Sequence, residues 1–241
     1  MKKRRDLLAD LPTRDIFITF AGTLAPLIAI IVALAVYGDD AVTKGVLLRP
    51  ALYVLKDYLY VVVIGMGVYL LGIRRTRATW AIIGFRQCSV DWIVKAFLLA
   101  ILLYWVQVVV NTSWTAAGFT KWADAPREND IAVVQASSTV TIIALSIVVA
   151  MLTPIAVEVF SRGLVFAWMR RNLDFTLSAI ASSIVFGVIH VEVVKYGQAV
   201  VFGIVAAYLY DRSSSLWPPI VLHLTVNSAY MIGVLRLASF I

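Results

Sequence analysis

The sequence predicts an all-α fold, a polytopic membrane bundle of about seven transmembrane helices with a core of four. Of the 241 residues, 61% are hydrophobic and only 15% are charged, and the mean hydropathy is +0.90. A soluble domain of this length could not hide so much apolar surface in one core. The apolar residues also gather in long runs, and one helical crossing of a bilayer needs about 20 such residues.

Seven runs are expected to span the bilayer. The first three, in residues 1–137, form an N-terminal part with an outer loop, and the last four, in residues 138–241, form the core. The fifth and sixth runs are short, and Glu192, Lys195 and Tyr196 predict a polar break between them, where irregular backbone needs cover from protein or water. In chain order the runs are Ile16 to Tyr37, Ala51 to Ile73, Trp92 to Val110, Ser138 to Met169, Phe175 to Val191, Gln198 to Tyr210 and Pro218 to Leu237.

The first run is predicted to stay as an anchor. The basic start at residues 1–5 is followed by the acidic, Pro-containing residues 6–15, unlike a cleavable signal peptide, and the run is long enough to span. Between the third and fourth runs, residues 111–136 form a long hydrophilic stretch of mixed charge, which is expected to fold over the outer surface.

The charge distribution predicts the orientation and excludes nucleic acid as a partner. The net charge is +7, but the basic residues cluster beside apolar runs, as expected for cytoplasmic loops facing an anionic leaflet. If the N-terminus is cytoplasmic and the C-terminus lies outside, twelve basic residues fall on the inner side and five on the outer side. This orientation is the one that the positive-inside rule favours. The twelve are Lys2, Lys3, Arg4, Arg5, Arg14, Arg74, Arg75, Arg77, Arg86, Arg170, Arg171 and Arg212, and the five are Lys44, Arg49, Lys121, Arg127 and Lys195.

Three pairs of residues spaced four apart stand out in the last third of the chain. Each pair shares one helical face, and an ionisable side chain in hydrocarbon costs about 2.5 to 3.5 kcal/mol, so it persists mainly where pairing or function compensates. A purely structural role also stays open: Glu158 and Arg162 could form a buried ion pair, and a lone histidine could form a hydrogen bond between helices. The pairs are Glu158 with Arg162, Phe186 with His190, and His223 with Asn227.

The neighbours of Glu158 also predict local structure. Pro154, one turn earlier, removes a backbone donor and predicts a kink that could admit water, while Gly163 permits a close helix crossing. Measured at about 1.5 Å per residue from the presumed inner ends, Glu158 lies about 18 Å deep, His190 about 24 Å and His223 about 9 Å. Tilt, the kink or a last helix that begins inside the bilayer is needed to bring these residues together.

A metal site is possible but not favoured. Glu158, His190 and His223 offer the N, N and O atoms of a zinc site, but the helical His-Glu-x-x-His spacing is missing. Cys88 is the single cysteine, which excludes an internal disulfide and a cysteine-based metal cluster, and it is expected to be unreactive. We therefore expect no metal and no other cofactor.

The motifs of the last third resemble the CPBP family, the CAAX-processing and bacteriocin-processing intramembrane proteases. The resemblance covers roughly Ser138 to the C-terminus, and the specificity comes from the order of the motifs, because each alone is short. Ile83 to Arg86 and Leu71 to Arg75 resemble the basic connector that precedes the core in such proteins. The motifs are Pro154-Ile155-x-x-Glu158-x-x-x-Arg162-Gly163, Ser182-Ser183-x-x-Phe186-Gly187-x-x-His190, Gly203 to Tyr210, and Ser215-Leu216-Trp217-x-Pro219-Ile220-x-x-His223-x-x-x-Asn227.

The resemblance implies a glutamate-type membrane endopeptidase of a bacterial or archaeal cytoplasmic membrane. It would cleave a membrane-associated or lipidated peptide with water held between helices. His190 would orient that water, Arg162 would hold Glu158, and Phe186 would support the site. His223 and Asn227 would stabilise the oxyanion.

One position departs from the family pattern, in which the first motif reads Glu-Glu-x-x-x-Arg. Val157 stands at the first glutamate and cannot accept a proton. Glu158 or Glu192 could take over the role of base, although residues 157 and 158 differ by about 100° around a helix. Alternatively, the protein is a catalytically inactive member acting as a membrane scaffold, chaperone or immunity factor. A transporter is disfavoured, because Lys56, Asp57, Lys95 and Gln107 trace no path.

Overall fold

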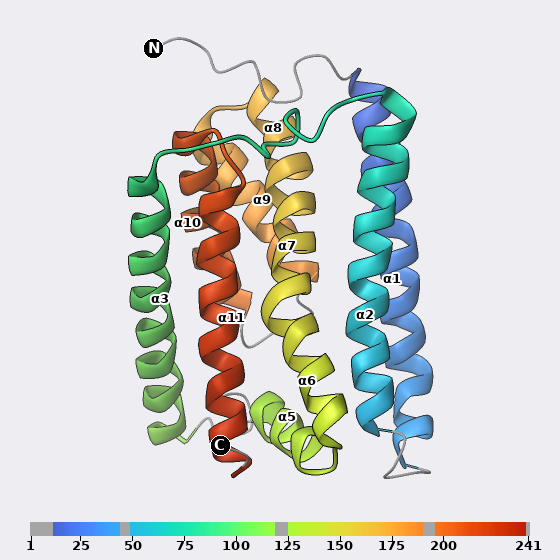
Figure 1. The fold of residues 1–241 in the computed structure, drawn as a ribbon, viewed down its shortest axis with the longest axis vertical. Helices are drawn as coiled ribbons and strands as arrows, with labels where there is room; N and C mark the ends of the chain where they lie inside the picture. Colours follow the sequence, from blue (N-terminus) through green and yellow to red (C-terminus); the bar gives the residue numbers. More distant parts are fainter. Residues whose placement is uncertain (1–11, 44–48, 119–124, 190–195, 240–241) are drawn as a thin grey trace.

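The computed structural model describes residues 12–43, 49–118, 125–189 and 196–239, and the regular structure in these ranges is helical (Figure 1). The predicted all-α membrane bundle is confirmed, and each predicted apolar run falls in a helix as far as it is described. The helices are α1 (Thr13–Thr43), α2 (Arg49–Gly67) continued by η1 (Val68–Arg74), α3 (Val90–Ala116), α5 (Ala125–Gln135), α6 (Thr139–Ile147), η2 (Val148–Leu152), α7 (Thr153–Glu158), η3 (Val159–Phe166), α8 (Ala167–Asn172), α9 (Phe175–Ile189), α10 (Tyr196–Ser213) and α11 (Trp217–Leu237).

Three of the described helices are long and apolar enough to cross a membrane: α3, α11 and the continuous stretch from α6 to α8, here called the central helix (Thr139–Asn172). The outer side of α3 is strongly apolar, with Phe97, Leu98 and Trp105 between 48% and 60% exposed. Exposed apolar stripes of this kind face lipid in a membrane protein, because hydrocarbon solvates them. The protein is therefore an integral membrane protein.

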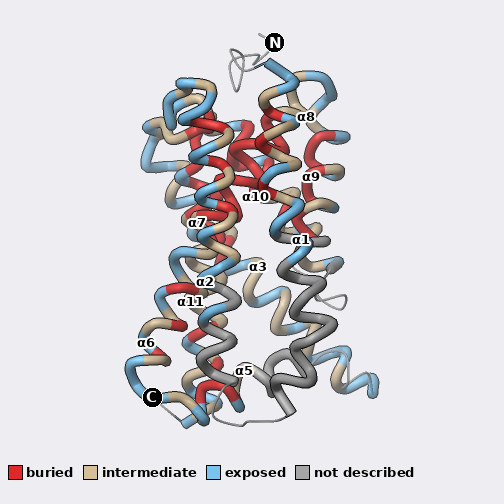
Figure 2. The backbone as a smooth tube through the Cα atoms, turned by 90° about the vertical axis from the view of Figure 1, so that its right-hand side faces the viewer, coloured by how far each residue is buried: buried red, intermediate tan, exposed pale blue. Residues whose placement is uncertain are grey.

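The central helix forms the middle of the bundle. In Figure 1 the α1–α2 pair lies on one side of it and α11 and α3 on the other, while α9 and α10 lie behind. Every residue from 156 to 167 is buried, as expected of a helix that is surrounded by protein on all sides. Figure 2 shows that the buried residues gather in the half of the bundle nearer to the N-terminus.

Two wide π-helical stretches, η2 and η3, interrupt the central helix. Pro154 follows the first of them and lies in the first turn of α7, where a missing backbone N–H is tolerated. The helix therefore continues past the proline. Such π-helical turns often occur at functional sites, and Glu158 lies at the junction of α7 and η3.

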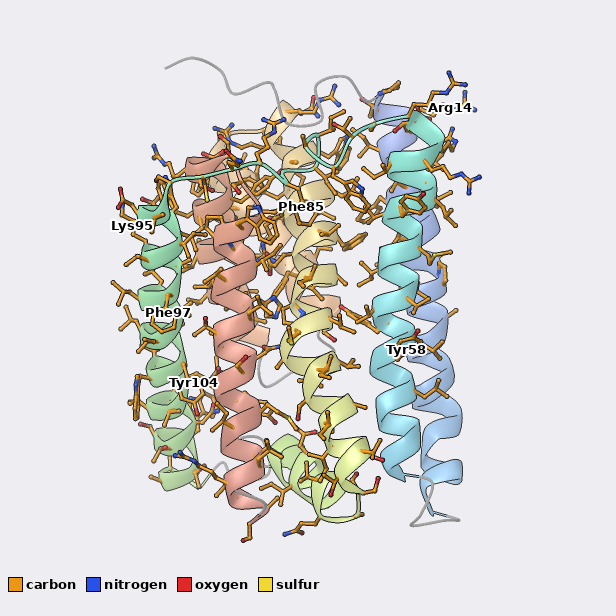
Figure 3. The ribbon with its side chains drawn as sticks, in the orientation of Figure 1. Arg14, Tyr58, Phe85, Lys95, Phe97 and Tyr104 are labelled. Carbon is orange, nitrogen blue, oxygen red and sulfur yellow. The ribbon has the colours of Figure 1, made fainter. Side chains whose placement is uncertain are left out.

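The connector between η1 and α3 packs into the core instead of lying loosely on it. Tyr210 donates its hydroxyl to the Ile83 carbonyl at 3.1 Å, and the Leu216 amide donates to the Gly84 carbonyl at 2.7 Å. Gly84 has a φ of +108°, which favours glycine. The Phe85 ring packs edge-on against Trp217 at 5.5 Å between centroids, between α11 and the central helix (Figure 3).

Gly163 allows this close packing. A Cβ at that position would lie 2.9 Å from the Ile83 carbonyl oxygen and 3.3 Å from the Ile83 Cβ. The expectation that Gly163 serves a helix crossing is thus corrected, because the closest neighbour of the glycine is the connector backbone. The reason is that Ile83 and Gly84 lie between the central helix and the α10–α11 turn.

The hydrophilic stretch at 111–136 is more helical than predicted. α3 continues to Ala116, and α5 lies across the end of the bundle near the C-terminus (Figure 1). Val133 and Val134 of α5 are buried against α6 and α11, and Tyr230 donates to Asp130. The apolar side of α5 thus explains why this segment forms a packed helix instead of an open loop.

Basic side chains mark the opposite end of the bundle. Figure 3 shows Arg14 at the start of α1, at this end. Seven further arginines lie at the end of η1 or just after it, in the connector, in α8, or at the end of α10, which are all at the same end in Figure 1. These residues are Arg74, Arg75, Arg77, Arg86, Arg170, Arg171 and Arg212.

We predict that Gly163→Ala destabilises the protein by about 1–3 kcal/mol, because the added methyl group meets connector backbone in an already packed core. Gly65→Ala is the matched control, since a Cβ at Gly65 has no atom within 4 Å. The measurement is thermal unfolding of the purified protein in detergent. Equal midpoints for the two variants would contradict the tight packing of the connector.

Candidate functional site

The candidate site is built around the carboxylate of Glu158, at the end of α7. Its Oε1 lies 2.8 Å from Nδ1 of His223, on the second turn of α11. Both residues are buried, with 0% and 4% of their surface exposed. The predicted meeting of these two distant motifs is therefore observed.

The depth mismatch expected between Glu158 and His223 has a simple cause. α8 continues the central helix beyond the level at which α11 begins (Figure 1). Counting residues from the helix ends therefore places Glu158 too deep relative to His223. The two prolines at the start of α11, Pro218 and Pro219, suit a first helical turn, where backbone N–H groups have no partner within the helix.

Arg162 neutralises the buried carboxylate. Its Nη1 donates to Glu158 Oε1 at 3.0 Å and to Ser161 Oγ at 2.6 Å, and its Nη2 donates to the Gly203 carbonyl at 3.1 Å. Ser161 in turn donates to the Val157 carbonyl at 2.5 Å. Because a buried charge is tolerated only when it is paired and hydrogen-bonded, this network explains how Arg162 remains 1% exposed.

Two phenylalanine rings enclose the polar groups. Phe186 of α9 and Phe202 of α10 stack at 5.6 Å between centroids, and His223 lies 4.9 Å from Phe202 and 5.8 Å from Phe186. The guanidinium of Arg162 lies 4.3 Å from the centre of the Phe186 ring, a cation–π contact. Phe186 therefore lies beside both Arg162 and His223, and the rings restrict the access of water to the pair.

Several buried oxygen atoms on the helices that form the site have no hydrogen-bond partner among the described residues. They include Glu158 Oε2, Ser183 Oγ and Thr153 Oγ1. Ser183 packs directly against Gly203, where a Cβ would lie 2.6 Å from its Oγ. Buried polar atoms of this kind are usually satisfied by water or a ligand.

Asn227 lies one turn beyond His223 on α11 and makes a different contact. Its Nδ2 donates to the Val149 carbonyl of η2 at 2.9 Å. The pair His223 and Asn227 thus fastens α11 to the central helix at two levels, at Glu158 and at Val149. Nδ2 of Asn227 has two N–H groups, and the contact with Val149 uses one of them.

Val157 lies in the main hydrophobic cluster and is 0% exposed. An apolar side chain therefore fills position 157, where the resemblance leads us to expect the first glutamate of the motif. His190 and Glu192, the other groups considered for activating water, lie outside the described residues. Glu158 is thus the carboxylate that the described part of the chain contributes to the site.

The sequence did not reveal the residues that support the pair. Ser161, Ser183, Phe202 and Gly203 complete the surroundings of Arg162 and His223. Ser183 and Gly203 occur in the motif strings, and a small residue inside an apolar run is the only signal they give. Their partners belong to other helices, so spacing along the chain could not show their roles.

The arrangement is suited to orienting an imidazole. A carboxylate bound to Nδ1 holds the ring and selects its tautomer, so that Nε2 becomes the atom for contact with a substrate or water. Glu158 uses one oxygen for both Arg162 and His223. A metal would find Glu158 and His223 together, but the described ranges contain no group of three His, Cys, Asp or Glu side chains arranged for one.

Comparison with known proteins supports the resemblance. Residues 139–229 match the model of the Rce1-like family, described as type II CAAX prenyl endopeptidase Rce1-like. This match confirms the similarity to CPBP membrane proteases over the segment that contains Glu158, Arg162, Phe186 and His223.

A Bacillus subtilis (strain 168) protein described as "Putative membrane peptidase YdiL" is 29% identical over 86 residues. The match covers 36% of this chain and 35% of that relative. No solved structure matches the chain.

We predict that Arg162→Leu destabilises the protein by about 3–5 kcal/mol, because it leaves the Glu158 carboxylate buried without its cation. Arg236→Leu is the control, since Arg236 is an exposed arginine on α11. The measurement is thermal unfolding in detergent. The double variant Glu158→Leu with Arg162→Leu should recover part of the loss, and a double variant less stable than Arg162→Leu would refute the role of Arg162 as counter-ion.

Proposed function

We propose that this protein is an intramembrane endopeptidase that hydrolyses a peptide bond with activated water. The observation that carries the proposal is the buried contact between Glu158 and His223, 2.8 Å apart, inside the segment that matches the peptidase family. Buried ionisable groups in a membrane protein are costly and mark functional sites by default.

In the proposed mechanism, Glu158 is a positioning residue for His223. The carboxylate holds Nδ1 and stabilises the imidazolium that forms when Nε2 takes a proton from water. The water oxygen then attacks the carbonyl carbon. The tetrahedral intermediate collapses as the C–N bond breaks, and the imidazolium returns the proton to the leaving amine.

Four further groups fit this mechanism. Glu158 Oε2 and Thr153 Oγ1 are buried acceptors that a water molecule could satisfy. Asn227 would offer its second N–H to the oxyanion, and His190, which lies outside the described residues, would add a second imidazole. The proposal requires no metal, because an imidazole can activate the water.

The proposed substrate is a peptide segment of a membrane-associated or lipidated protein. The site is lined by Phe186 and Phe202 within an integral membrane protein, so a substrate reaches it from the bilayer or its surface. The family description names a prenyl endopeptidase, and the Bacillus subtilis relative is described as a membrane peptidase. The arginine-rich end would face the cytoplasm of a bacterial or archaeal cell, together with the N-terminus.

A second function is favoured by one observation. Val157 is fully buried among apolar side chains at the position of the usual first glutamate. A protein that keeps the scaffold without hydrolysis would act by binding a membrane partner, as a scaffold, chaperone or immunity factor. In that case the Glu158–Arg162–His223 network would serve stability alone.

We predict that His223→Ala lowers the rate of peptide cleavage by about 10²–10⁴-fold, because it removes the proposed acid and base. Glu158→Gln should also lower it, since an amide cannot stabilise the imidazolium. Thr225→Val, on the same helix, is the control, and His190→Ala tests the second imidazole. The assay is product release, followed by mass spectrometry, from farnesylated and unmodified membrane-anchored peptides, and equal turnover by wild type and both histidine variants would refute the proposal.

Val157→Glu distinguishes the two functions. If the native chain is silent because the first glutamate is missing, this variant should cleave a peptide that the native chain leaves intact. Val157→Gln is the matched control, since it has nearly the same size but cannot take a proton. Activity in the native chain that Val157→Glu leaves unchanged or lowers would exclude the silent alternative.

A further inference from the structure

The π-helical stretch η2 leaves one backbone carbonyl of the central helix without its helical donor. In a π-helix each N–H donates to the carbonyl five residues earlier, and the Thr153 N–H does so to the Val148 carbonyl. The next N–H in this pattern would donate to the Val149 carbonyl and would belong to residue 154. That residue is Pro154, which has no backbone N–H. The Val149 carbonyl is therefore open to a donor from outside the helix.

A side chain of another helix uses this carbonyl. Nδ2 of Asn227, on α11, donates to it at 2.9 Å. The hydroxyl of Thr153 does not, although Thr115 and Thr225 each donate to the carbonyl four residues earlier. Oγ1 of Thr153 has no partner among the described residues. The bond to the Val149 carbonyl thus comes from Asn227 and not from the neighbouring threonine.

The contact fixes the orientation of the Asn227 amide. A carbonyl oxygen can only accept a hydrogen bond, so Nδ2 and not Oδ1 must face the central helix. His223, one turn earlier on α11, is held by Glu158 of the same helix at 2.8 Å. The imidazole and the amide are therefore oriented by two separate acceptors, a carboxylate and a backbone carbonyl.

We propose, on the basis of the proposed function, that Pro154 is a positioning residue for Asn227. By leaving the Val149 carbonyl open, the proline lets this carbonyl hold the amide while the second N–H of Asn227 meets the oxyanion. Another residue at position 154 would bring a backbone N–H that competes for the same carbonyl. The amide would then rotate more freely, and a donor stabilises an oxyanion best when its orientation is already fixed.

Stability and turnover should change in different directions. A proline in a helix removes a hydrogen bond, so Pro154→Ala should leave the midpoint of thermal unfolding unchanged or raise it. The same variant should lower kcat by about tenfold. KM should stay within about twofold, because the oxyanion exists only after the attack on the carbonyl carbon.

The test is a double-variant cycle on cleavage of the membrane-anchored peptide by the purified full chain in detergent. Asn227→Ala should lower kcat by about 10²–10³-fold. Adding Pro154→Ala to it should lower kcat by less than a further twofold or so, since no amide is left to position. Pro26→Ala is the matched control, because Pro26 lies inside α1 and is exposed, and it should keep the wild-type constants.

Thermal unfolding of the same four chains gives a measurement that does not depend on activity. In the native chain Asn227→Ala leaves the Val149 carbonyl without its donor, so the midpoint should fall. In Pro154→Ala the new N–H can replace that donor, so the same change should lower the midpoint less. Equal shifts in the two backgrounds would show that the two residues do not share the carbonyl and would overturn the inference.

The kinetic outcomes separate this inference from the proposed function. Wild-type kcat in Pro154→Ala, or an undiminished loss when Asn227 is already alanine, would overturn the positioning role and leave hydrolysis standing. A lowered unfolding midpoint in Pro154→Ala would make the proline a folding residue and would also overturn it. A native chain that cleaves no peptide would refute the proposed function, and the thermal cycle alone would then decide whether Pro154 holds Asn227.

Discussion

The buried carboxylate of Glu158 is the constraint on which the core depends. A charge with 0% exposure in a membrane helix needs a counter-ion and hydrogen bonds. Arg162 supplies both and extends them to Gly203, while His223 brings in α11. A single side chain thereby relates the positions of the central helix, α10 and α11. The surrounding Phe186 and Phe202 strengthen these interactions, because electrostatic attraction grows as water is excluded.

The central helix can hold this network because its shape is irregular. The π-helical stretch η3 begins directly after Glu158, and it contains both Ser161 and Arg162. Wider turns change the angle between successive side chains relative to an α-helix. Spacing on an ideal helix is therefore a poor guide to which residues face one another here, including the relation between Val157 and Glu158.

Much of the fold could be predicted from the sequence, because the bilayer imposes a length and an apolar composition on each crossing. The Glu158–Arg162 pair could be predicted from its four-residue spacing. The contact between Glu158 and His223 could be expected only from the family resemblance, since 65 residues separate them. Gly203 and Ser183 could not be assigned roles, because helix contacts within membranes use small residues whose partners are distant in sequence. The α5 segment was missed because its polar composition hides two buried valines.

The connector at residues 81–86 has a consequence for how the two parts of the chain belong together. Ile83, Gly84 and Arg86 supply carbonyl acceptors to Tyr210, Leu216 and Ser215, and Ile83 fills the notch beside Gly163. A fragment that began at residue 138 would expose these three donors and an empty notch adjacent to Arg162. The packed wall beside Arg162 is therefore shared between the last helices and a connector that precedes residue 138 in the chain.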